Sequence, residues 1–182
     1  YINQFAGEYK ETSLSAMQRL NAKLNRDGDP KDFATAYGLA KSMVKQADSK
    51  NKEVRTLTGD AKTKAEAEFA KLLGETVRIV KIALALWTPK ENLDELNRSR
   101  YFLAYLYFLS RDRNDEAMVL GDFVARKYAK DNPDLALDCA FMALYSAQQA
   151  FQASPEPQKE FYVRRLIEIG DNRHGTLRTP EG

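Results

Sequence analysis

The sequence holds very little of the chemistry that most enzymes and metal proteins use. Among 182 residues there is one cysteine, Cys139, and one histidine, His174. One cysteine excludes an internal disulfide, and a closed zinc site needs several cysteine, histidine or carboxylate ligands. Glu-x-x-His pairs, a Gly-x-Ser-x-Gly nucleophile motif and a phosphate-binding loop are also missing. We therefore predict no catalytic residue, no metal site and no cofactor.

An excess of charge of one sign is also missing. The 28 Lys and Arg residues nearly balance the 26 Asp and Glu residues, for a formal net charge of +2. Nucleic-acid binders usually carry a clustered basic excess, and the mildly basic stretch 41–64 is expected to be a solvated surface. The longest apolar run, Tyr101 to Leu109, is about half of the ~20 residues that span a bilayer. We predict a soluble chain without nucleic-acid binding or membrane insertion. The compartment stays open between the cytoplasm and a bacterial periplasm.

Residues that interrupt helices are sparse, with 9 Gly and 6 Pro. Apolar residues instead recur at intervals of three and four, the spacing of one helix face. This pattern predicts an all-α chain of about seven helices joined by mostly short links, which favour antiparallel neighbours. The expected helices cover about residues 1–24, 30–48, 61–87, 88–110, 115–130, 133–153 and 155–170, with a polar loop at 49–60 and a frayed tail at 171–182.

Four local signals predict where helices begin. Asp29 with Pro30, Asn132 with Pro133, and Ser154 with Pro155 each place a capping side chain before a proline suited to the first turn. Thr88, Pro89 and Glu91 form a capping box, so a helix is expected to start there or a few residues later.

The predicted helix 133–153 carries the clearest packing signal. Alanines recur along it at intervals of four and three, which predicts close approach of a neighbouring helix. These small residues are Ala136, Ala140, Ala143, Ala147 and Ala150. Larger residues run beside them and are expected to fill the groove between the two helices, namely Leu137, Phe141, Leu144 and Phe151.

The stretch Tyr101 to Pro133 resembles a tetratricopeptide (TPR) repeat, a helix pair of 34 residues with small and large residues at fixed places. Tyr101 falls on the first aromatic position, Ala104 on a leucine position and Phe108 on the tyrosine that ends the first helix. Ala117 falls on the small position of the second helix. The departures from the family pattern are Tyr105, Gly121, Val124 and the late Pro133.

This resemblance implies antiparallel hairpins stacked as a short TPR-like superhelix. The expected domain covers residues 1–170, with a better-matched repeat at 98–133 and a degenerate one at 134–170. It implies a non-enzymatic scaffold that binds another protein or a peptide. Because the sequence starts at Tyr1 without a methionine, we expect a piece of a larger protein. Two alternatives are a helical bundle with a ligand pocket between helices and a purely structural spacer.

The candidate protein-binding residues are Phe102, Leu106 and Leu109. Their spacing places them on one side of the helix, and the resembling family uses that side to line a peptide groove. The alternative is that another helix covers them, since a helix that is apolar all round is usually buried.

Overall fold

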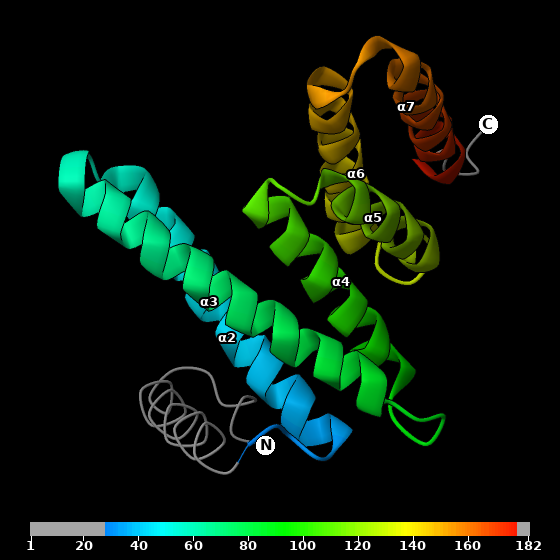
Figure 1. The fold of residues 1–182 in the computed structure, drawn as a ribbon. Coiled ribbons are helices and arrows are strands. Elements are labelled where there is room, and N and C mark those ends of the chain that lie inside the picture. The colour runs from blue at the N-terminus through cyan, green and yellow to red at the C-terminus, as the bar shows by residue number, and fades with distance from the viewer. Residues whose placement is uncertain (1–27, 178–182) are drawn as a thin grey trace. The chain divides into compact units, whose positions relative to one another are not determined.

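The computed structural model describes residues 28–177, and all regular structure in that range is helical (Figure 1). The six helices are α2 (Phe33–Thr56), α3 (Gly59–Leu86), α4 (Leu93–Ser110), α5 (Asn114–Tyr128), α6 (Pro133–Ala153) and α7 (Glu156–Leu177). The all-α prediction is confirmed for residues 28–177. The first of the seven expected helices, at 1–24, lies outside the described residues. No helix in the described range is long and apolar enough to cross a membrane.

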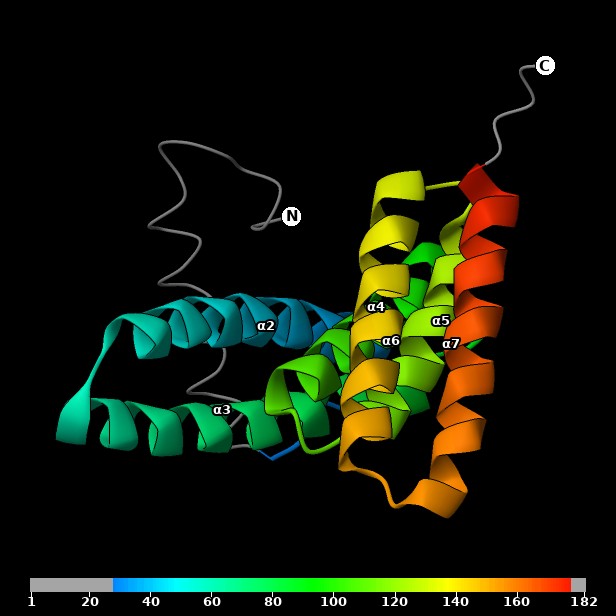
Figure 2. The ribbon, with the colours of Figure 1, turned by 90° about the horizontal axis from the view of Figure 1, so that it is seen from above.

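The chain divides into two compact units, Tyr1–Ser99 and Arg100–Gly182, and the division falls inside α4. In the first unit, α2 and α3 run side by side as a long hairpin (Figure 2). Alanines and larger apolar residues of α2 are buried in this unit, and Ala36, Ala40 and Ala47 are completely buried. Small residues at helical spacing let the two backbones approach closely.

The expected start of α2 is wrong by one turn. Asp32, and not Asp29, caps the helix, because its side chain accepts a hydrogen bond of 2.8 Å from the backbone N–H of Thr35. Asp29 instead forms an ion pair with Arg78 of α3. Two aspartates three residues apart offer equivalent local caps, so a tertiary contact distinguishes them.

The loop expected at 49–60 is also wrong, because α2 continues to Thr56 and α3 begins at Gly59. The polar residues of this stretch lie on solvated helix surface, where Lys50 pairs with Glu53 at 3.0 Å and with Glu68 at 2.8 Å. A polar composition does not end a helix when the segment contains no glycine or proline before the real turn.

In the second unit, α5, α6 and α7 follow one another as antiparallel neighbours (Figure 2). The expected start of α6 is confirmed: Asn132 accepts a hydrogen bond of 3.1 Å from the N–H of Leu135, and Pro133 occupies the first turn. α7 begins directly after Pro155, as its capping signal predicted, and continues to Leu177 where a frayed tail was expected from residue 171. Residues 178–182 lie outside the described range.

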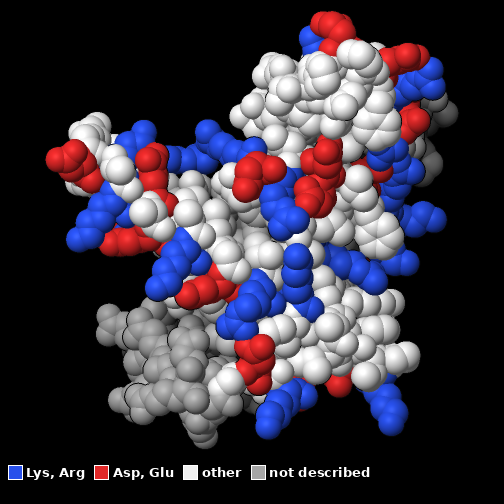
Figure 3. Space-filling model, viewed as in Figure 1, with Lys and Arg blue, Asp and Glu red and all other residues white. Residues whose placement is uncertain are grey.

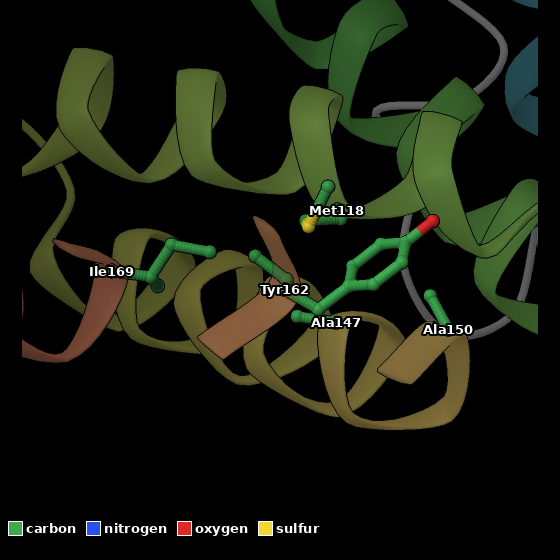
Figure 4. Packing of buried hydrophobic residues seen from close by; sticks show 6 residues of the cluster. Met118, Ala147, Ala150, Tyr162 and Ile169 are labelled. Carbon is green, nitrogen blue, oxygen red and sulfur yellow. The ribbon is translucent and has the colours of Figure 1, made fainter. Parts of the chain in front are cut away.

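The alanine stripe of α6 forms the centre of the second unit, and all five of its alanines are buried. Ala143, Ala147 and Ala150 pack against Met118 of α5 and against Tyr162 and Ile169 of α7 (Figure 4). A second cluster joins α5 and α6, with the aromatic residues of α4 against it; its buried members are Val124, Tyr128, Ala136, Cys139 and Met142.

Candidate interaction surface

The strip that the sequence singled out on α4 is not the open apolar surface of the second unit. Leu106 is 0% exposed and Leu109 9%, while Phe102 is half-buried. All three lie at the helical spacing that was expected. Their role in binding a protein stays a prediction.

The exposed large apolar residues of the second unit lie on the three later helices instead. They are Val119 and Phe123 on α5, Leu137 and Phe141 on α6, and Phe161, Val163 and Ile167 on α7. Single exposed apolar side chains are ordinary on a protein surface, so the arrangement of the set matters more than its size.

Four of these side chains lie on the neighbouring helices α6 and α7, and we refer to them together as the α6–α7 face: Leu137, Phe141, Val163 and Ile167. Each pair is separated by four residues, and so by about one helical turn. On α7, Tyr162, Arg165 and Ile169 point toward α5 and the core, which leaves Val163 and Ile167 on the flank turned away from α5. On α6, the half-buried Leu144 packs at the contact with α7, and the strip of Leu137 and Phe141 lies just outside it.

The large residues beside the alanine stripe were expected to fill the groove between helices. This is correct for Leu144 and Phe151, which are half-buried against the core. It is wrong for Leu137 and Phe141, which are 39% and 56% exposed. Their side chains lie on the side of α6 that neither α5 nor α7 covers, although the ring of Phe141 stacks on Tyr145 at 6.3 Å between centroids.

Carboxylates border the α6–α7 face. Asp134 and Asp138 lie on α6 next to Leu137 and Phe141, and Asp171 lies one turn beyond Ile167 on α7; all three are exposed. None of the three makes an ion pair with another side chain that the structure describes. Two basic residues of α7 also lie beside the face, and both are paired: Lys159 with Glu156 at 2.6 Å, and Arg164 with Glu160. In Figure 3 the surface over α6 is largely free of charged side chains, with charges of both signs around it.

The remaining exposed apolar residues, Val119, Phe123 and Phe161, lie on other sides of the α5–α7 pair and have a different surrounding. The guanidinium carbon of Arg100 stands 5.2 Å from the centre of the Phe123 ring.

Asp122 of α5 holds α7 in place. Its side chain is only 10% exposed and accepts two hydrogen bonds from Arg126, of 3.0 and 2.6 Å, and one of 3.2 Å from Arg165 of α7. The hydrogen bond to Asp122 raises the pKa of Arg126 above its ordinary value. Because α7 carries half of the α6–α7 face, this junction links that half to α5.

A second link joins the same two helices one to two turns away. The hydroxyl of Tyr162 donates a hydrogen bond of 2.9 Å to Asp115. Burial raises the pKa of Tyr162, and the bond to Asp115 raises it further. Asp115, Met118 and Asp122 thus present one stripe of α5 to α7, so that α7 contacts both of the helices before it.

The described residues contain no cluster of three or more Cys, His, Asp or Glu side chains that could hold a metal ion. The side chain of His174 lies outside what the structure describes. Comparison with models of protein families, with curated proteins and with solved structures found no match to this chain.

Proposed function

We propose that this chain is a non-enzymatic, TPR-like helical-repeat scaffold that binds another protein or a peptide, with the α6–α7 face as the binding surface. The observation that carries the proposal is the exposure of Leu137, Phe141, Val163 and Ile167, between 39% and 56%, on two adjoining helices. Contiguous apolar surface that stays open to solvent is typical of an interaction site.

The packing of the last three helices supports a stacked array. α5, α6 and α7 are antiparallel in sequence order, and α7 contacts α6 through the core and α5 through Asp115 and Asp122. In stacks of helical hairpins, each added helix covers apolar surface left by the preceding pair. Under this proposal the better-matched repeat contributes α4 and α5, and the degenerate repeat contributes α6 and α7.

The test compares two double variants of the full chain that remove apolar surface of equal exposure. Phe141→Ser with Ile167→Ser disrupts the α6–α7 face, where each residue is 56% exposed. Val119→Ser with Phe161→Ser removes residues that are each 54% exposed elsewhere on the same unit. Surface substitutions of this kind usually change the free energy of unfolding by about 0.5 kcal/mol or less, and urea unfolding checks that both variants remain folded.

Each immobilised protein is incubated with an extract of its source cells, and the captured proteins are quantified by mass spectrometry. We expect a set of proteins held by the wild type and by the Val119/Phe161 variant but lost by the Phe141/Ile167 variant. If both variants capture equally, the α6–α7 face is not the binding surface. If the wild type captures nothing beyond a blank support, the scaffold proposal fails.

A further inference from the structure

We propose that the partner presents a basic amphipathic helix to the α6–α7 face, with its apolar side on Leu137, Phe141, Val163 and Ile167 and its Lys or Arg residues toward Asp134, Asp138 and Asp171. This inference rests on the proposed function and names the chemistry of the partner.

The packing within the second unit shows how a helix fits such a surface. α7 lies on α5 and α6 through Tyr162, Leu166 and Ile169, which recur at intervals of four and three. The α6–α7 face offers the same kind of platform, two adjoining antiparallel helices with apolar residues one turn apart. A partner helix with apolar residues at the same spacing packs ridges into grooves on it. An added strand has no sheet edge to pair with in residues 28–177.

The carboxylates beside the α6–α7 face indicate that the partner carries positive charge. Asp134, Asp138 and Asp171 are exposed beside the apolar strip without an ion pair among the described side chains, whereas Arg164 is paired with Glu160. Lys or Arg residues on the flanks of a bound helix would complement these carboxylates and orient the helix.

The same carboxylates oppose other occupants. An anionic lipid surface and the phosphates of a nucleic acid would both be repelled by them. A second copy of this chain that docked through the same face would bring the two sets of aspartates together. A basic amphipathic helix is the occupant that can both pack on the apolar residues and pair with the aspartates beside them.

The probes are two fluorescent 18-residue peptides with leucines at intervals of three and four. One carries Lys on both flanks of the leucine stripe, and its twin carries Glu at every Lys position. Binding to the full chain is followed by anisotropy at low and at physiological ionic strength. We expect the Lys peptide to bind at least about tenfold more tightly than the Glu twin, with affinity that falls as salt rises.

Two further variants test whether the aspartates beside the α6–α7 face, and not the total charge of the protein, determine the affinity for the Lys peptide. Asp134→Asn with Asp138→Asn should lower the affinity for the Lys peptide by about threefold to tenfold and reduce the salt dependence of that affinity. Asp60→Asn with Asp112→Asn removes two exposed aspartates that lie elsewhere in the chain and likewise make no ion pair with another described side chain, and should leave binding unchanged. Phe141→Ser with Ile167→Ser should abolish binding of the Lys peptide.

The outcomes distinguish this inference from the proposed function. Equal binding of the two peptides overturns the basic partner, and so does failure of both peptides while capture from the extract still depends on Phe141 and Ile167. In both cases the proposed function survives. Sedimentation velocity that shows a dimer of the wild type, lost on Phe141→Ser with Ile167→Ser, identifies a second copy as the occupant and also overturns the inference. Binding to vesicles of phosphatidylserine that is lost on Phe141→Ser with Ile167→Ser would identify a membrane as the occupant and would also overturn the inference.

Discussion

Gly121 on α5 faces Ala143 on α6 at a distance that leaves no room for a larger residue. A Cβ atom at Gly121 would stand 3.2 Å from the Cβ of Ala143 and 2.9 Å from the carbonyl oxygen of Cys139. The carbonyl oxygen belongs to the helix backbone and cannot move aside as a flexible side chain does. The spacing between α5 and α6 is therefore set by the absence of a side chain at one position.

We predict that Gly121→Ala lowers the free energy of unfolding by about 1–3 kcal/mol, because the added methyl group overpacks the contact. Gly74→Ala is the matched control, since Gly74 is exposed inside α3 and has no heavy atom within 4 Å of the added Cβ. That change should raise stability by about 0.4–1 kcal/mol through the unfolded chain. Urea unfolding followed by circular dichroism measures both, and an equal gain for the two variants would contradict the close contact.

The same contact is tested from the other helix by Ala143→Leu. Ala143 is completely buried, and its backbone nitrogen and Cβ lie next to Gly121. We expect a loss of about 1–3 kcal/mol, as is usual when methylene groups are forced into a packed interior. An unchanged urea midpoint would show that this side of α6 is not packed.

The starts of α6 and α7 were predictable because their signals are local. Asn132 with Pro133 and Ser154 with Pro155 each specify a helix start within a few residues, and the structure confirms both. The extent of α2 was not predictable in the same way. Its last turns are polar, and they are supported by ion pairs such as Lys50 with Glu68 of α3, which a reading of one segment cannot anticipate.

Which apolar strip of the second unit is exposed could not be predicted from the sequence. Leu106 on α4 and Phe141 on α6 both belong to apolar strips with helical spacing, yet one is 0% and the other 56% exposed. Spacing assigns a residue to a side of its helix, whereas exposure depends on which other helix packs there. Gly121 was read as a departure from the TPR pattern, and the structure gives it a packing role. The bond between Arg165 and Asp122 joins residues 43 positions apart, without any local signal.

We predict that Leu106→Asp lowers the free energy of unfolding by about 3–5 kcal/mol, because it places a carboxylate where the side chain is completely buried. Leu137→Asp is the control, at a position that is 39% exposed, and should cost about 1 kcal/mol or less. Thermal unfolding measures the melting temperature of each variant relative to the wild type. A melting temperature unchanged by Leu106→Asp would mean that the α4 strip is open and restore it as a binding groove.

The junction between Asp122 and Arg165 should couple α5 and α7 energetically. A double-mutant cycle with Asp122→Asn and Arg165→Met should give an interaction of about 0.5–3 kcal/mol, since Asp122 is largely buried. The adjacent pair Glu160 and Arg164 serves as the reference, with side chains that are 73% and 72% exposed. Its cycle, with Glu160→Gln and Arg164→Met, should give about 0.5 kcal/mol or less. Equal coupling in the two cycles would argue against the junction as the element that fixes α7.

The Cys139 thiol should be unreactive in the folded protein. It is completely buried between α5 and α6, and burial raises its pKa from 9.0 to about 12, with the carboxylate of Asp138 adding to the rise. The thiolate is the reactive form, so a disulfide reagent at pH 8 should modify Cys139 only as fast as the protein opens. Reaction should become fast in concentrated urea. Rapid modification without urea would show that the contact between α5 and α6 is loose.

The same shift makes stability depend on alkaline pH. Between about pH 9 and pH 12 the unfolded thiol loses its proton while the folded thiol keeps it, so the unfolded state binds fewer protons and the free energy of unfolding falls as pH rises. Cys139→Ala removes this group and leaves the other titrating residues in place. At pH 7 the variant should be less stable than the wild type, by about 1 kcal/mol, because of the small cavity. Between pH 9 and pH 10.5 the stability of the variant relative to the wild type should rise by about 1–2 kcal/mol, so that the variant becomes at least as stable as the wild type. Urea unfolding at each pH measures this, and a constant difference would mean that the thiol ionises alike in both states.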